Sequence, residues 1–193
     1  MNGKAMTEGA PWKHILTFAM PVLAGSLLQQ LYNTVDTIVV GKFAGEESLA
    51  SVGTTGTLTF FLLAIAIGLS AGNGVVVAQF YGAKKEKEVR EAASTGILLL
   101  LLLGIVISIV GIAGSRLALK YWIKVPDEIM KLTLLYLRIY IVGLVFQYGY
   151  NIFSSILRAI GDSAATLYFL LISSVINILL DLQLDVPLRG HII

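Results

Sequence analysis

The chain contains no cysteine, and only two of its 193 residues are histidine. The sequence therefore excludes a disulfide framework and a thiolate metal site, and His14 and His191 lie far apart. We expect no metal centre. Charged residues are also scarce, at 13% of the chain, where an average soluble protein has about 25%. With a net charge of +2 and scattered basic residues, the sequence does not predict nucleic-acid binding.

Hydrophobic residues make up 56% of the chain, and the mean hydropathy is +0.84. Apolar runs long enough to cross about 30 Å of hydrocarbon predict about five transmembrane helices. Their expected positions are residues 15–40, 55–80, 94–117, 131–154 and 163–182. The runs are continuous and rich in Leu and Ile, without the alternation of barrel strands. The predicted fold class is an all-α integral membrane protein.

The expected domain organisation is a polar leader, a membrane domain and a short tail. Residues 1–14 form the leader, which shows no secretory cleavage pattern and is expected in the cytoplasm. Residues 15–182 form the membrane domain, and residues 183–193 are too few to span. The densest basic cluster, Lys84 to Arg90, favours a cytoplasmic position for its loop. This predicts a multi-pass protein of the inner (plasma) membrane with its carboxyl terminus outside.

Asp36 places a carboxylate inside an otherwise apolar helix. An acid at membrane depth costs about 2.5 to 3.5 kcal/mol, so it is expected to face a protein interior or a wet cavity. The alternative is that the helix ends in the headgroups, since Lys42 follows closely. At about 100° per residue, the polar residues of this helix share one face. The cavity-lining candidates on it are Gln29, Tyr32 and Asn33.

Two further candidates lie on the fourth predicted span. Gln147 and Asn151 are four residues apart and therefore share a face of the helix. Such a pair can either hydrogen-bond to another helix or line a cavity.

A second membrane carboxylate, Asp181, lies four residues after Asn177 on the fifth predicted span. Asp36 and Asp181 lie about 31 and 27 Å from the starts of their predicted helices, which cross in the same direction. If the faces converge, Asp36, Asn177 and Asp181 would surround a pocket of hard oxygen ligands suited to a sodium ion or a proton. The alternative is that Asp181 ends its helix at the interface.

Several segments resemble the amino-terminal half of the multidrug and toxic compound extrusion (MATE) family. They are residues 31–37, 68–72, 79–83 and 157–162, together with Asn177 and Asp181. The resemblance implies a carrier of two six-helix lobes that exports cationic amphipathic compounds in exchange for sodium ions or protons. It also implies that Asp36, Asn177 and Asp181 match the family's cation site. Small-molecule substrates and membrane lipid are the implied partners, and no cofactor is implied beyond the coupling ion.

The sequence departs from the family after Asp181, where a sixth helix and a second lobe would follow. The chain is expected to form most of one six-helix lobe and to be inactive alone, because alternating access needs two moving halves. A truncated or frame-shifted reading frame would explain this departure. A second lobe or a second copy of the chain would then be the missing partner.

Three other functions fit parts of the sequence. A lipid-linked saccharide flippase has a related architecture, but its anionic substrate calls for a cationic cavity, and the predicted face is acidic and amide-lined. An intramembrane aspartyl protease would use two membrane carboxylates, but neither Asp36 nor Asp181 lies in a Tyr-Asp or Gly-x-Gly-Asp setting. A non-transporting membrane subunit that pairs with another lobe is the third. The protein is not expected to be an enzyme.

Overall fold

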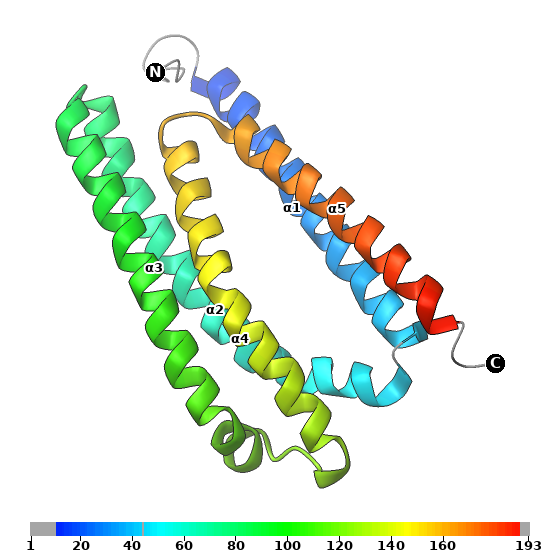
Figure 1. The fold of residues 1–193 in the computed structure, drawn as a ribbon. Helices are drawn as coiled ribbons and strands as arrows, with labels where there is room; N and C mark the ends of the chain where they lie inside the picture. The colour runs from blue at the N-terminus through cyan, green and yellow to red at the C-terminus, as the bar shows by residue number, and fades with distance from the viewer. Residues whose placement is uncertain (1–10, 44, 190–193) are drawn as a thin grey trace.

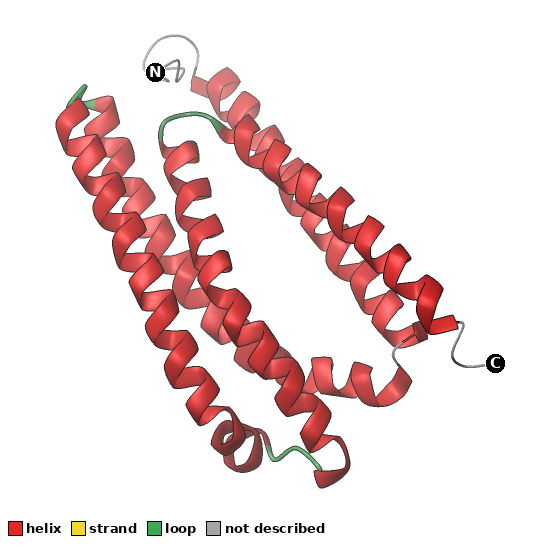
Figure 2. Ribbon diagram, viewed as in Figure 1, coloured by secondary structure: helices red, strands yellow, loops and turns green. Residues whose placement is uncertain are grey.

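A computed structural model of the chain describes residues 11–43 and 45–189. Within these ranges some side chains lie outside the description, among them those of Tyr32, Asp36 and Asp181. The described residues form α-helices and one π-helical segment, with no strand among them (Figure 2). The elements are α1 (Pro11–Phe43), α2 (Gly45–Gly82), α3 (Glu86–Leu117), η1 (Ala118–Ile123), α4 (Asp127–Ala159) and α5 (Ser163–Arg189).

The all-α prediction is confirmed, and each of the five α-helices extends beyond its predicted span at one end or both. The first two predicted spans, 15–40 and 55–80, leave residues 41–54 between them, yet α1 reaches Phe43 and α2 begins at Gly45. Glu46 and Glu47 lie in the first turn of α2, where acidic side chains interact favourably with the helix dipole. The fifth helix was expected to end near residue 182, but α5 continues to Arg189. Helix ends depend on hydrogen bonding and caps, so they need not coincide with the end of an apolar run.

Three helices of the described part are long and apolar enough to cross a membrane. They are Glu46–Gly82, Glu86–Ile123 and Asp127–Ala159. The described part of α5 contains a shorter apolar stretch, Ser163–Asn177. Each long helix exceeds the roughly 20 residues that the hydrocarbon requires, so its ends extend into the headgroup regions.

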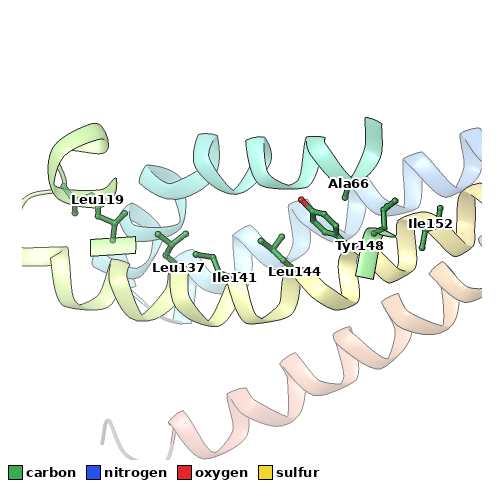
Figure 3. Close-up of a cluster of buried hydrophobic side chains, with 9 residues drawn as sticks. Ala66, Leu119, Leu137, Ile141, Leu144, Tyr148 and Ile152 are labelled. Atoms are coloured by element: carbon green, nitrogen blue, oxygen red, sulfur yellow. The ribbon is translucent and has the colours of Figure 1, made fainter. Parts of the chain in front are cut away.

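The core lies where α4 packs against α2 and α3 (Figure 3). Leu137, Ile141, Leu144, Tyr148 and Ile152 follow one another at intervals of three or four residues and are all fully buried. This spacing places them along one stripe of α4. The stripe packs against residues of α2, α3 and η1, namely Ala66, Leu100 and Leu119.

Polar side chains link α4 to its neighbours at several levels. The Tyr148 hydroxyl donates to the Leu62 carbonyl of α2 at 2.8 Å, and the Ser155 hydroxyl donates to the Ser70 carbonyl at 2.7 Å. On the other side, Ser108 of α3 donates to the Ile141 carbonyl at 2.8 Å. In lipid, helices associate through close packing and such bonds rather than through the hydrophobic effect. The α2–α3–α4 unit is therefore held by apolar packing and by interhelical hydrogen bonds.

Helices α1 and α5 form a second pair, which lies side by side and runs in the same direction (Figure 1). Helix α5 follows α4 after a short turn that contains Gly161. The φ of Gly161 is 89°, which suits a residue without a side chain. Asp162 then caps α5, since its Oδ1 accepts a hydrogen bond from the Ala165 N–H at 3.0 Å.

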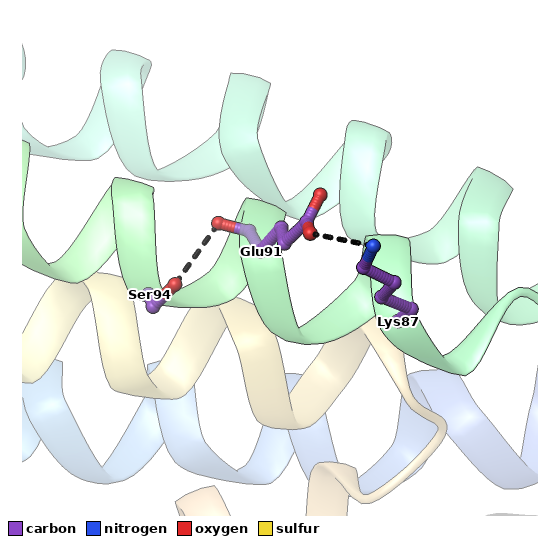
Figure 4. A network of polar contacts seen from close by, with 3 residues as sticks. All are labelled: Lys87, Glu91 and Ser94. Atoms are coloured by element: carbon purple, nitrogen blue, oxygen red, sulfur yellow. Dashed lines mark hydrogen bonds and ion pairs between the residues drawn. The ribbon is translucent and has the colours of Figure 1, made fainter.

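The turn between α2 and α3 carries the basic cluster at the same end of the molecule as the α4–α5 turn (Figure 1). There Lys87 and Glu91 form an ion pair at 3.8 Å, and the Ser94 hydroxyl donates to the Glu91 carbonyl at 3.1 Å (Figure 4). Both charged side chains are largely exposed, so the pair adds little stability. This end of α3 is a solvated surface.

Candidate functional site

A cleft opens where α1, α4 and α5 meet, with about 390 Å³ of empty space that is partly open to the surroundings. Helix α4 contributes Tyr150 and Arg158 to its lining, and the other lining residues come from α1 and α5. Those are Pro21, Val22, Gly25, Ser26, Gln29, Ser163, Thr166, Leu167 and Leu170.

Local sequence explains why α1 and α5 approach closely beside this cleft. Gly25 has no side chain, and a Cβ at its position would lie 3.6 Å from Leu170 Cδ2 and 3.8 Å from Leu167 Cδ1. The leucines of α5 therefore pack almost onto the α1 backbone. Pro21 lies inside α1, which continues through it. A proline within a membrane helix is tolerated where neighbouring groups support the backbone.

The cleft has both polar and apolar lining residues, and it carries one charge among those described, the guanidinium of Arg158. Arg158 and Thr166 are half-buried. The Thr166 hydroxyl oxygen is buried and has no hydrogen-bond partner, whereas Ser26 donates to the Val22 carbonyl of its own helix at 3.0 Å. Such a cleft favours an anionic or hydrogen-bond-accepting ligand over a cation.

The predicted cation site is only partly visible. Asn177 is half-buried on α5. The side chains of Asp36 and Asp181 lie outside the described residues, so their approach to Asn177 stays a prediction. Among the side chains that the structure describes, no group of three or more metal-ligating residues converges.

The cavity-lining candidates separate into different environments. Gln29 lines the cleft, whereas Asn33, Gln147 and Asn151 are not among its lining residues, and the Tyr32 side chain is not described. The Asn151 amide donates to the Gln147 carbonyl at 2.8 Å, within α4. This bond joins the pair along one helix. The role of the two side chains in a cavity or in contact with another helix stays a prediction.

Sequence reasoning missed Arg158, Thr166 and Tyr150. Arg158 lies between the predicted spans 131–154 and 163–182, but α4 extends to Ala159, so the arginine lies in the last helical turn. The signal that could have found it is the very short connection to α5, which brings the end of α4 beside the start of the next helix.

Comparisons with known proteins agree with this architecture. Residues 21–182 match the MatE family model. The chain is 30% identical over 169 residues to the probable multidrug resistance protein YoeA of Bacillus subtilis. The aligned region covers 88% of this chain and 36% of YoeA. It is 24% identical over 169 residues to the probable multidrug resistance protein NorM of Thermotoga maritima, covering 88% of this chain and 36% of that one.

Solved structures give the same result. A crystal structure of a MATE protein in complex with MaD3S superposes with a TM-score of 0.86 and 29% identity, covering 94% of this chain and 40% of that chain. A MOP superfamily transporter from Pyrococcus furiosus, which has a binding pocket of reverse polarity, gives the same values. The chain thus spans less than half the length of these relatives.

These matches confirm the resemblance drawn from the segments around Asp36, Gly68 and Arg158, and they concern transporters rather than enzymes. The chain belongs to the MATE family of multidrug efflux transporters and is a multi-pass protein of the plasma membrane.

Proposed function

We propose that the chain forms the ion-binding, amino-terminal part of a multidrug exporter that exchanges cationic amphipathic compounds for sodium ions or protons. The observation that carries this proposal is the register of α1 against α5, fixed by the contact of Gly25 with Leu170. Both helices run in the same direction from that contact (Figure 1).

The register supports a shared level for the two membrane acids. Position 36 follows Gly25 by eleven residues, and position 181 follows Leu170 by the same interval. At 1.5 Å per residue, both backbone positions lie about 16 Å beyond the contact. Eleven residues also complete slightly more than three helical turns, so each position returns to the helix face that makes the contact. Asn177 is seven residues after Leu170, an interval that also returns to this face.

The residue types at this level suit a coupling cation. Two carboxylates and an amide carbonyl are hard oxygen ligands, which sodium accepts, and a carboxylate can alternatively take up a proton. Acids within a membrane commonly mark ion or proton pathways. Asp36, Asn177 and Asp181 are the proposed ligands, and no other cofactor is part of the proposal.

The substrate class rests on the family and on the names of the relatives, which are called multidrug resistance proteins. We expect the chain alone to be inactive as an exporter. Alternating access moves two halves about a central site, and the chain covers about 40% of the matched structures. A second lobe, or a second copy of the chain, would supply the other half.

Equilibrium binding of ²²Na⁺ to the purified chain in detergent tests the ion site. We expect saturable binding that weakens as the pH falls, because protons compete for the same oxygens. Asp36→Asn and Asp181→Asn should each abolish it, whereas Asp127→Asn, an exposed acid at the start of α4, should leave it unchanged. Binding that is equal in all four proteins, or absent at every pH together with no proton release on sodium addition, would refute the site.

Drug tolerance tests the activity separately. The chain is expressed in an exporter-deficient bacterium, and growth is measured against a series of cationic dyes. We expect no increase over the empty vector. An increase that disappears in Asp36→Asn would show that the chain exports by itself, and the proposed need for a second half would then be wrong.

A further inference from the structure

We propose that the cleft between α1, α4 and α5 binds a phosphate group, carried either by a lipid headgroup or by a small phosphate anion. This inference goes beyond the proposed exporter function. It concerns the cleft beside the Gly25–Leu170 contact, about 16 Å along the helices from positions 36 and 181, and it does not depend on whether those residues bind an ion.

Among the described residues, Arg158 carries an uncompensated charge. It is the one charged residue among the described residues that line the cleft, and no described acid pairs with it. A half-buried charge without a partner is costly, so a bound anion would stabilise the cleft. The planar guanidinium can donate two parallel hydrogen bonds to a phosphate, which makes arginine the preferred residue for such groups.

The Thr166 hydroxyl is buried on α5 and has no hydrogen-bond partner among the residues that the structure describes. A buried polar atom without a hydrogen bond is unusual in a folded protein and needs an explanation. A ligand oxygen in the cleft would accept its proton. Gln29 and Tyr150 add an amide and a phenol to the same lining, so several neutral donors accompany the arginine.

The position of Arg158 also favours an anionic headgroup. Arg158 lies in the last turn of α4 and Ser163 begins α5, so this part of the cleft is at the α4–α5 turn, the end of the molecule that also carries the α2–α3 turn (Figure 1). Basic pockets between membrane helices at the cytoplasmic side are typical binding places for anionic headgroups. Val22, Leu167 and Leu170 form an apolar part of the lining that an acyl chain could cover.

One acid, Asp162, follows Arg158 by only four residues. Asp162 is exposed, and its Oδ1 already accepts the Ala165 N–H as the cap of α5. It is not among the described residues that line the cleft. Its capping role therefore leaves the positive charge of Arg158 available to a ligand.

The test uses native mass spectrometry of the purified full chain, which is exchanged into a detergent containing one added ligand at a time. The three ligands are phosphatidylglycerol, a digalactosyl diacylglycerol with the same acyl chains but no phosphate, and inorganic phosphate. Four variants are compared with the unmodified chain: Arg158→Gln, Arg158→Lys, Thr166→Val and Arg90→Gln. Circular dichroism and thermal unfolding without ligand confirm that each variant is folded.

We expect phosphate-dependent binding that falls about tenfold in Arg158→Gln, since loss of a charge-assisted bond has effects of this size. Arg158→Lys should retain part of it, Thr166→Val should weaken it several-fold, and Arg90→Gln, an exposed arginine at the same end, should not change it. Binding of phosphatidylglycerol alone identifies a headgroup site, and binding of inorganic phosphate as well identifies a site for phosphate anions in general. Equal retention of the phosphate-free lipid, or binding that is insensitive to Arg158→Gln in a folded variant, would overturn the proposal.

Discussion

Tyr148 of α4 is fully buried and donates its hydroxyl to the backbone carbonyl of Leu62 on α2, at 2.8 Å. The ring fills the core between α2, α3 and α4, while its oxygen reaches a carbonyl of α2 (Figure 3). A carbonyl has two lone pairs, so that of Leu62 can accept this bond in addition to one within its own helix. One side chain thus combines core packing with an interhelical hydrogen bond.

Removing only this hydroxyl should destabilise the α2–α4 contact modestly. We expect Tyr148→Phe to lower the free energy of unfolding by about 0.5 to 1.5 kcal/mol, the usual net value of a hydrogen bond. Tyr148→Ala should cost about 3 to 5 kcal/mol, because it also leaves a cavity. The measurement is reversible unfolding in mixed micelles with increasing dodecyl sulfate. Tyr168→Phe, on a side chain that is 65% exposed, is the matched control and should change little. A Tyr148→Phe protein as stable as this control would show that the bond contributes nothing.

A close approach between Gly74 of α2 and Ser155 of α4 leads to a second prediction. A Cβ at Gly74 would overlap Ser155 Oγ, and that hydroxyl donates to the Ser70 carbonyl at 2.7 Å. We expect Gly74→Ala to destabilise the chain by about 1 to 3 kcal/mol, because the hydroxyl must move and its bond is lost. The backbone of Ser155 and its Cβ stay at ordinary contact distances, 3.4 and 3.6 Å.

The double variant makes this prediction specific. In Gly74→Ala with Ser155→Ala, the overlapping oxygen is gone, so the combined loss should be smaller than the sum of the two single losses. Gly68→Ala on the same helix has nothing within 4 Å of its new Cβ and serves as the control. Strict additivity in the double variant would mean that the two residues do not touch.

The helices could be predicted from the sequence because the apolar runs are long and the membrane admits few alternatives. The last turn of α4 and the helical start of α2 could not, since hydropathy does not record where backbone hydrogen bonds end. Asp36 and Asp181 were conspicuous as charges in apolar surroundings. Arg158 was not, because its importance comes from the fold, which places it in the lining of the same cleft as Thr166 of another helix.

The absence of native cysteine permits a direct test of topology. Lys87, in the first turn of α3, and Lys120, in η1, are both exposed and about 50 Å apart along a continuous helical path. Because the cluster from Lys84 to Arg90 favours the cytoplasm, we expect Lys120→Cys to react with a membrane-impermeant maleimide in intact cells. Lys87→Cys should react only after permeabilisation. The reverse pattern would place the amino terminus outside.

The register of α1 against α5 underlies the proposed ion site and can be tested by cross-linking. Gly25 lies beside Leu170, whereas Phe169 is one residue away, about 100° around the helix and 57% exposed. We expect Gly25→Cys with Leu170→Cys to be joined rapidly by a short bifunctional thiosulfonate, because the two positions face each other. Gly25→Cys with Phe169→Cys should react much more slowly.

Cleavage at a protease site inserted between α2 and α3, followed by gel electrophoresis, detects the link as a fragment pair that stays together until reduction. If the second pair reacts as fast as the first, α5 is rotated or mobile relative to α1. The eleven-residue step from this contact to Asp36 and Asp181 would then no longer place the two acids on facing sides.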